Sequence, residues 1–255
     1  MSTPSPLHES PQFKIIPANT RGQADFGWLK ARYSFSFGEY QNPSSMGFST
    51  LRVLNEDVVQ PSRGFGAHPH RNMEILTYVI SGQLQHQDSM GNGSIIQAGD
   101  IQLMSAGSGI THSEINPSDT QAVHLLQIWI YPKNRGTEPR YQQAHIAEID
   151  KLNRFCILAS PNGEQNSLEI DQDVFIYAGI FDRSSSLASI KTPWQQQRCA
   201  YLHLIKGSMT LLLNGQIQVL LSAGDALQIE QATSIEIIEV IENTSEILWF
   251  DLNKE

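Results

Sequence analysis

The sequence predicts an all-β protein built from two similar β-barrels. Short segments rich in β-branched and aromatic residues follow one another about every ten residues, with turn residues between them. No long segment with helical periodicity occurs before about residue 140. The second half of the chain also repeats the first at a constant offset of 125 positions. Such a repeat is typical of one structural unit used twice.

The first half reads as a flexible tail followed by a series of strands. Residues 1–12 are polar and rich in proline, so we expect no fixed structure there. Alternating apolar and polar residues predict strands at YSFSF and GFSTLRVL, residues 33–37 and 47–54. Further strands are expected at EILTYVI, QLQHQ, SIIQ, IQLM and AVHLLQIWIY, residues 74–80, 83–87, 94–97, 101–104 and 122–131.

A polar segment separates the two halves. Residues 133–154 contain Pro139 and several charged residues, which indicates a connection between domains, with a short helix expected near its end. The predicted organisation is a tail, an N-terminal metal-binding domain, a linker and a C-terminal metal-free domain, at residues 1–12, 13–142, 143–154 and 155–255.

Two pairs of potential metal ligands lie in the first half, His68-Pro-His70 and His112-Ser-Glu114. Residues i and i+2 of a strand point to the same side, so each pair can direct two donors to one point. If the two strands are neighbours in a barrel, three imidazoles and one carboxylate meet inside it. This set suits Fe, Mn, Co, Ni, Cu or Zn. Chance explains one His-x-His pair, but two pairs in one β-rich stretch favour a metal site.

Glycines immediately precede the first histidine pair. Gly64 and Gly66 flank Phe65, and a residue without a side chain lets the backbone approach the site closely. A plain loop is the alternative explanation.

The second half lacks the ligands of the first. At the offset that aligns Gly82 with Gly207, the three histidines correspond to Pro193, Gln195 and Ile237, while Glu114 corresponds to Glu239. One carboxylate beside an amide holds a divalent ion poorly, so no metal is expected in the C-terminal domain. His203 takes the place of Tyr78 on a predicted strand, where we expect a structural role.

Composition limits the classes of partner. The net charge is −9 and no basic block occurs, which argues against direct binding of nucleic acid. No apolar run reaches the length of a membrane span, and the two cysteines are far apart in sequence rather than part of a disulfide framework. A cytoplasmic protein is expected, and a monomer is favoured over an oligomer.

Several motifs occur together in order and resemble one family. HPHRNMEILTYVISG and SAGSGITHSE are similar to motifs of the pirin family, two-domain members of the cupin superfamily. With HQDSMGN and LLQIWIYP, the set resembles the bacterial pirin-like quercetin 2,3-dioxygenases. The resemblance implies two packed cupin barrels. Ser105 replaces the usual proline of the second cupin motif, and one extra residue precedes His112.

The resemblance also bears on the carboxylate ligand. In most cupins the glutamate that follows His-x-His is a ligand, and here that residue is Glu74. In pirins the ligand follows the late histidine, which points to Glu114. We therefore expect Glu114 to bind the metal and Glu74 to lie beside the site, with Glu74 as the alternative ligand.

The resemblance implies a function. A pirin-like dioxygenase would use one divalent transition metal, expected to be Fe(II), to cleave flavonols such as quercetin with dioxygen, giving a depside and carbon monoxide. Glu114 is the expected proton acceptor. The alternative is a non-enzymatic, iron-binding regulator whose redox state controls binding to a transcription factor or a metabolic enzyme. A different cupin reaction, such as an isomerisation, is a third hypothesis.

An aromatic substrate needs an apolar pocket. Candidate wall residues are Phe48, Phe65, Met73 and Met104, although an ordinary core position is the favoured explanation for each of them individually. His86 precedes a polar turn and is expected at the surface, with a position beside the metal ligands as the alternative, and His124 is expected to be a hydrogen-bonded core histidine.

Overall fold

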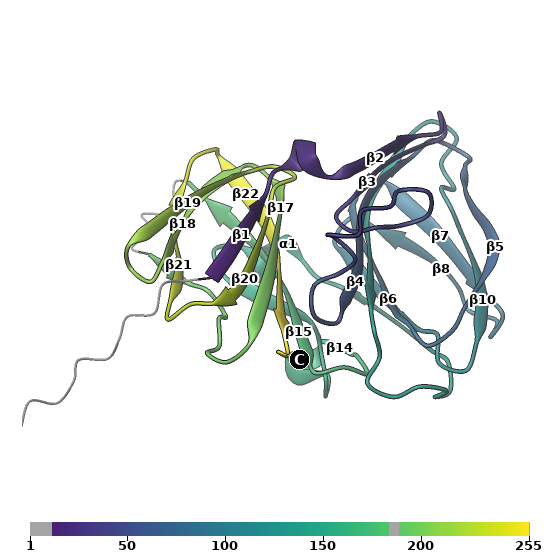
Figure 1. Cartoon of the computed structure of the whole chain (residues 1–255). Helices are drawn as coiled ribbons and strands as arrows, with labels where there is room; N and C mark the ends of the chain where they lie inside the picture. The colour runs from purple at the N-terminus through teal and green to yellow at the C-terminus, as the bar shows by residue number, and fades with distance from the viewer. Residues whose placement is uncertain (1–11, 184–188, 255) are drawn as a thin grey trace, which may run out of the picture.

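Four β-sheets form two barrels that lie side by side (Figure 1) in the computed structural model, which describes residues 12–183 and 189–254. All named strand pairs are antiparallel except one short parallel pair. The all-β prediction with two cupin barrels is confirmed. No helix in these two ranges is long and apolar enough to cross a membrane.

The first barrel contains a seven-stranded and a four-stranded sheet. The seven-stranded sheet has the order β12 (Arg140–His145), β9 (Asp100–Ser105), β6 (Glu74–Ser81), β11 (Val123–Ile130), β4 (Leu51–Val59), β3 (Leu29–Tyr33) and β2 (Gly22–Asp25). The four-stranded sheet has the order β5 (Gly64–His70), β10 (Ile110–Ile115), β7 (Gln83–Asp88) and β8 (Gly93–Gln97).

The second barrel repeats this plan. Its seven-stranded sheet has the order β1 (Gln12–Ile16), β20 (Ala226–Gln231), β17 (Cys199–Lys206), β22 (Thr244–Leu252), β15 (Val174–Asp182), β13 (Phe155–Ser160) and β14 (Leu168–Glu169). Its four-stranded sheet has the order β16 (Ile190–Lys191), β21 (Ile235–Val240), β18 (Ser208–Leu213) and β19 (Ile217–Ser222). The short helix α1 (Glu148–Lys151) and the 3₁₀ turns η1 (Ala18–Thr20) and η2 (Glu164–Asn166) connect strands.

Two early strand predictions were wrong in their bounds. Residues 34–50 turn rather than extend, and β4 begins only at Leu51. In the YSFSF segment, the Ser36 hydroxyl donates to the carbonyl oxygen of Asn42 and accepts from its N–H, which closes a loop. Phe35 is buried between the barrels, so its apolar character reflects tertiary packing rather than strand alternation.

The observed barrels differ from the expected domain division at both ends of the first domain. Strand β1, from residue 12 onward, pairs with β20 of the second barrel, and Phe13 packs against the core of that barrel. It thereby covers an edge strand that would otherwise expose unpaired backbone groups. Strand β12 extends to His145, inside the expected linker. The expected tail lies outside the described residues apart from Gln12.

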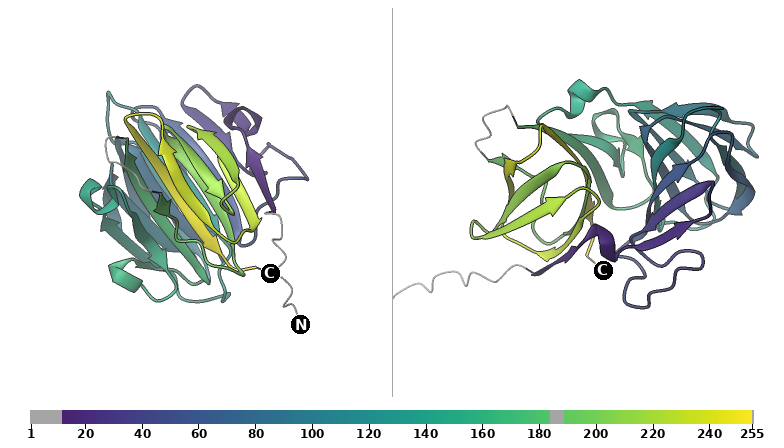
Figure 2. Two further views of the ribbon diagram at one scale, coloured as in Figure 1. Left: turned by 90° about the vertical axis from the view of Figure 1, so that its left-hand side faces the viewer. Right: turned by 90° about the horizontal axis from the view of Figure 1, so that it is seen from above.

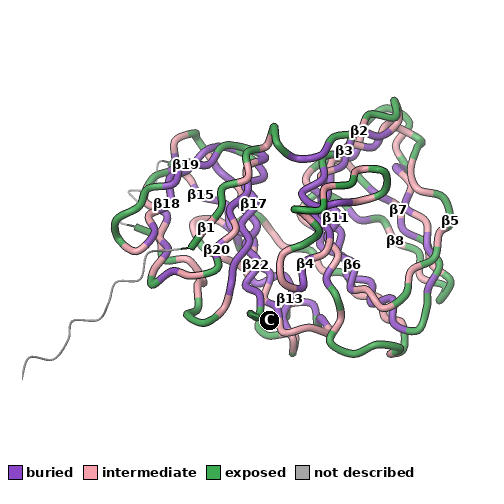
Figure 3. Tube along the Cα trace, viewed as in Figure 1, coloured by how far each residue is buried: buried purple, intermediate pink, exposed green. Residues whose placement is uncertain are grey.

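The two seven-stranded sheets pack face to face and bury the largest apolar cluster (Figure 2, right, and Figure 3). Leu54, Leu76 and Ile128 contribute from the first barrel, and Tyr201 and Phe250 contribute from the second. Central strands such as β4, β6 and β11 therefore have one face in this interface and the other inside the first barrel, so only alternate residues can reach a site in the barrel interior.

Polar residues also join the barrels, among them one group around Tyr78 and another around Glu56. The Tyr78 hydroxyl donates to Glu246 at 2.5 Å and accepts from Lys151 Nζ at 2.6 Å. In the second group, Glu56 accepts from His124 at 3.0 Å and from Arg21 at 2.8 Å, and the buried His203 lies 3.9 Å from Glu56. Both Tyr78 and His203, which are 125 positions apart, lie in the interface between the barrels, and this position agrees with the structural role expected for His203.

Candidate metal centre

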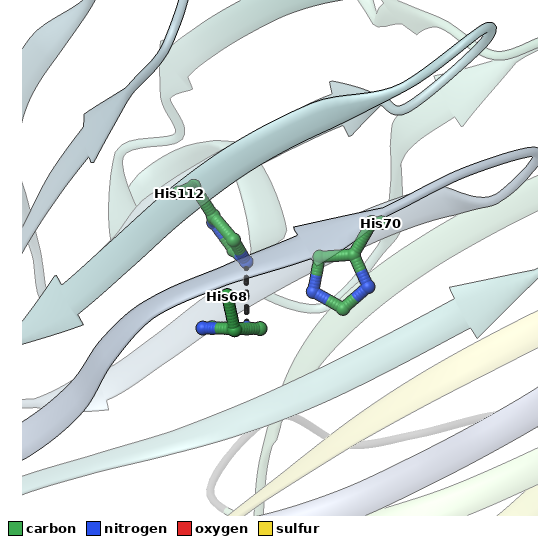
Figure 4. A group of neighbouring side chains, drawn as sticks. All are labelled: His68, His70 and His112. Atoms are coloured by element: carbon green, nitrogen blue, oxygen red, sulfur yellow. Dashed lines mark hydrogen bonds between the residues drawn. The ribbon is translucent and has the colours of Figure 1, made fainter.

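Three histidine side chains converge inside the first barrel (Figure 4). His68 and His70 extend from β5, and His112 extends from the neighbouring strand β10, directly opposite His68. Their ring centroids lie 4.5–4.9 Å apart, and their metal-binding nitrogens lie within 4.8 Å of one another. The predicted meeting of the two strands is therefore present.

The ring nitrogens are arranged as ligands of one cation would be. His68 Nδ1 donates to the carbonyl oxygen of Gly66 at 2.8 Å, which leaves Nε2 with its lone pair. That Nε2 lies 3.1 Å from His112 Nε2. Two nitrogens about 2.1 Å from one cation and at right angles are about 3.0 Å apart. The spacing thus fits adjacent positions around a first-row ion.

Burial keeps two of the imidazoles neutral. Desolvation, together with the nearby His68, lowers the pKa of His70 to about 4 and that of His112 to about 3. Neutral imidazole is the form that binds a metal, so these rings need lose no proton near neutral pH.

Glu114 follows His112 on the same face of β10 and is buried. Its carboxylate accepts hydrogen bonds from Thr77 Oγ1 at 3.2 Å and from Gln127 Nε2 at 2.8 Å. One carboxylate oxygen also lies within 4.8 Å of ring nitrogens of His86 and His112. Burial raises the pKa of Glu114, against the opposing effect of the Gln127 hydrogen bond. Glu114 thus adjoins the histidine triad through His112.

A bulge positions these ligands. Between Phe65 and His68, β5 carries one more residue than the facing part of β10, and such bulges change the direction of nearby side chains. A Cβ atom on Gly64 would lie 2.1 Å from the carbonyl oxygen of Glu114, whereas one on Gly66 would meet nothing within 4 Å. Of the two glycines considered from the sequence, only Gly64 is required by close backbone approach.

Glu74 lies in neither ligand group. It begins β6 and is buried, but its carboxylate accepts from Ser105 Oγ at 2.8 Å and from the Asp171 N–H at 3.4 Å. Ser105 is the residue that replaces the usual proline, and its hydroxyl directs Glu74 toward the second barrel. The geometry favours Glu114 as the carboxylate beside the histidines.

His86 was expected at the surface, and this was wrong. The side chain is fully buried, with Nδ1 3.5 Å from His112 Nδ1 and Nε2 3.2 Å from Asp88. Tyr141 packs against the ring at 4.9 Å between centroids. The alternation in QLQHQD places His86 on the same face as the buried Leu84, and this signal could have identified it.

The histidines line a cavity of about 70 Å³ whose other walls are mostly apolar. Its lining comprises Leu29, Tyr33, Phe37, Asn55, Asp57, Phe65, His68, His70, Ile75, His112, Glu114, Gln127 and Trp129. Of the candidate wall residues, Phe65 is present. Phe48 instead packs against Tyr201 between the barrels, and Met73 and Met104 belong to a cluster beside Ile110. Two other lining residues, Trp129 and Asp57, were not predicted. The ring centroid of Trp129 lies 4.9 Å from that of His70.

The strand register shows that Glu239, which the repeat aligned with Glu114, does not occupy the equivalent position in the second barrel. Glu114 lies opposite His86, and the position equivalent to His86 is Leu211, which lies opposite Ile237. The structural counterpart of Glu114 is therefore Ile237, and Glu239 is exposed. Among the residues described, no potential ligand group occurs in this barrel, whose interior is filled by apolar side chains.

Comparisons with known proteins agree with this arrangement. A family model described as Pirin matches residues 16–130, and one described as a quercetinase C-terminal cupin domain matches residues 157–252. A quercetin 2,3-dioxygenase of Escherichia coli K12 is 43% identical over 92% of this chain and 96% of its own length. A putative quercetin 2,3-dioxygenase of Pasteurella multocida is 42% identical over 94% and 99%, respectively.

Solved structures show the same likeness. The crystal structure of the bacterial pirin YhhW of Escherichia coli in complex with nickel(II) superimposes with a TM-score of 0.86 at 40% identity, covering 96% of this chain and 100% of that one. A quercetin 2,3-dioxygenase of Acinetobacter baumannii, at 18% identity and a TM-score of 0.70, shares the fold.

Proposed function

Because this chain belongs to the pirin family of two-domain cupins, we propose that it is a metal-dependent dioxygenase that cleaves flavonols such as quercetin to a depside and carbon monoxide. The observation that carries the proposal is the convergence of His68, His70 and His112 beside Glu114 in one largely apolar cavity. Relatives that match nearly the full chain are named quercetin 2,3-dioxygenase, which supports the choice of reaction.

Four residues would hold the cation: His68, His70, His112 and Glu114. Three neutral imidazoles and one carboxylate suit Fe(II), and equally Mn, Co, Ni, Cu or Zn. The nickel(II) complex of the related pirin supports a first-row ion here. When bound, such an ion supplies a Lewis acid for the adjacent 3-hydroxyl and 4-carbonyl oxygens of a flavonol, together with a route for reaction with dioxygen.

The remaining residues of the cavity would prepare the substrate. Leu29, Phe37 and Ile75 exclude water and favour a flat aromatic ring. Glu114 would accept the proton when the O–H bond of the 3-hydroxyl breaks, and burial, which raises its pKa, suits it to that role. Thr77 and Gln127 hold the carboxylate in place during the transfer.

The test is oxygen uptake and release of carbon monoxide with quercetin, measured on protein loaded separately with each first-row ion. We expect turnover with at least one ion and at least a 100-fold loss in His70→Ala. His145→Ala, which removes a largely exposed histidine outside the cavity, is the matched control. Metal binding without oxygen uptake under any of these conditions would contradict the dioxygenase and favour the non-enzymatic, redox-sensitive regulator.

A further inference from the structure

A buried carboxylate in the same cavity has one oxygen that accepts no hydrogen bond from the residues described by the structure. Asp57 is on β4, on the face that points into the barrel, and its side chain lines the cavity with a residue exposure of only 4%. Its neighbours on the adjacent strands are Ala31 and Leu125, which offer no side-chain donor. Within the described residues, no group donates a hydrogen bond to Asp57 Oδ1.

A second unpaired acceptor lies two residues earlier on the same strand. Asn55 belongs to a row of polar residues that crosses the sheet from β3 to β6, through Tyr33, Asn55, Gln127 and Thr77. Gln127 and Thr77 use their polar groups on Glu114, whereas Asn55 Oδ1 has no partner among the described residues. Buried acceptors without donors reduce stability, and both of these acceptors belong to residues that line the cavity, so they are available to a donor on a ligand that enters it.

The cavity has an open and a closed end. His68 and His70 are partly exposed, whereas Asp57 and Asn55 are buried. Its volume of about 70 Å³ is about half that of an engineered apolar cavity of roughly 150 Å³ that binds one benzene molecule. The cavity therefore admits the edge of one ring, and that edge passes the histidines before it reaches the two acceptors.

We propose that Asp57 and Asn55 recognise a ring hydroxyl of the aromatic substrate, and so determine which hydroxylation pattern the cavity accepts. The inference rests on the proposed function for the class of substrate. The entering hydroxyl donates to Asp57 Oδ1 or Asn55 Oδ1 while the apolar walls hold the ring. A site of this kind discriminates strongly against an analogue that lacks the hydroxyl, because the buried acceptors then stay unpaired.

The test compares ligands and variants by anaerobic binding titration of the full chain loaded with nickel(II). The ligands are 3-hydroxyflavone, which has no further hydroxyl, 3,5,7-trihydroxyflavone and quercetin. The tighter of the two ligands 3,5,7-trihydroxyflavone and quercetin should bind wild type with at least tenfold higher affinity than 3-hydroxyflavone does. Asp57→Leu should reduce this ratio to about one, and Asp57→Asn, which keeps an acceptor, should retain most of it. Gln102→Leu is the control, since Gln102 is buried and unpaired but lines no part of the cavity.

Thermal unfolding provides the second readout. Removing an unpaired buried carboxylate should leave the melting temperature of Asp57→Leu equal to or above that of wild type, whereas loss of a structural contact would lower it. An unchanged ligand ratio in Asp57→Leu, or a lower melting temperature, overturns the inference while the dioxygenase proposal stands. Failure of wild type to bind any of the three flavonols instead overturns the proposed function.

Discussion

The Nδ1 atom of His86 lies 3.5 Å from the Nδ1 atom of His112, whose other ring nitrogen, Nε2, lies 3.1 Å from His68 Nε2. If His112 Nε2 binds a cation, its Nδ1 carries the proton and can donate to His86. His86 Nε2 can then donate to Asp88, 3.2 Å away. Asp88 is itself held by Asn92 and by the N–H of Met90. Such a chain fixes the orientation of the metal-binding ring.

The first prediction concerns this chain of hydrogen bonds. His86→Phe keeps a buried ring against Tyr141 but removes the acceptor for His112. We expect the affinity for nickel(II) or iron(II) to fall 10–100-fold, as is usual when the partner of a metal-binding histidine is lost. Isothermal titration or competition with a chelator measures it. His145→Phe removes a histidine paired with Asp100 outside the site and should change nothing; equal affinities in the two variants would contradict the prediction.

The second prediction concerns stabilisation by the metal. A ligand that binds only the folded state at 100 times its dissociation constant raises the free energy of unfolding by about 2.7 kcal/mol. Chemical denaturation with and without nickel(II) should show this increase in wild type. In His112→Ala the increase should vanish, because His112 belongs to both ligand groups. An equal increase in this variant would show that the cation binds at another site.

The third prediction concerns the glycines before His68. Gly64→Ala places a methyl group against the backbone of Glu114, so β5 must move away from β10. We expect a loss of stability of about 2–4 kcal/mol, in the range of severe backbone clashes, and weaker metal binding. Gly66→Ala is the matched control, since its Cβ would meet open space. Urea denaturation of both variants measures the difference, and equal stabilities would show that the clash is relieved without cost.

The fourth prediction concerns pH. Burial, then the nearby charges of Glu114 and Glu56, raises the pKa of Asp57 from 3.8 to about 7 in the folded protein. Between these values the folded state binds the proton that the unfolded state has released, so the stability contribution of Asp57 falls as pH rises from about 4 to 7. Asp57→Leu removes this contribution, which is at most about 4 kcal/mol.

The measurement is the free energy of unfolding of both proteins from pH 5 to pH 8. The stability of Asp57→Leu relative to wild type should increase from pH 5 to about pH 7 and level off above that pH. Asp251, whose pKa burial raises to about 6, is present in both proteins and cancels in the comparison. A difference independent of pH would show that Asp57 does not titrate in this window.

The fifth prediction concerns the joint between the barrels. Lys151 is almost fully buried and interacts with Tyr78 and Glu246. Glu246→Leu leaves its ammonium group without a carboxylate, and loss of one partner from a buried ion pair costs about 3–5 kcal/mol. Tyr78→Phe should cost less, about 1–3 kcal/mol, because only a hydrogen-bonded hydroxyl is lost. Denaturation followed by tryptophan fluorescence gives both values, and the reverse order would contradict this account.

Local patterns identified most of the strands and all three converging histidines. Patterns of apolar residues located β6 to β9 and β11 to within about two residues, because residues that face a core recur with period two. The same period placed His68 and His70, and His112 and Glu114, on common faces. His86 obeyed the rule too, but its polar neighbours suggested the surface. The alternation around Phe35 wrongly predicted a strand. Phe35 is buried because it packs against the other barrel, not because it faces the interior of its own.

The sequence by itself predicted that two barrels follow one plan and that the first carries a set of potential metal ligands, since both predictions depend on residue identity and short-range periodicity. Tertiary structure alone decided that β5 pairs with β10 and that Ile237 takes the place of Glu114 in the second barrel. It also decided that β1 pairs with a strand of the second barrel and that Asp57 is buried in the cavity. Those features depend on which distant strands pair and in which register. Register is set by the burial of whole faces, a property that no short segment of the chain contains.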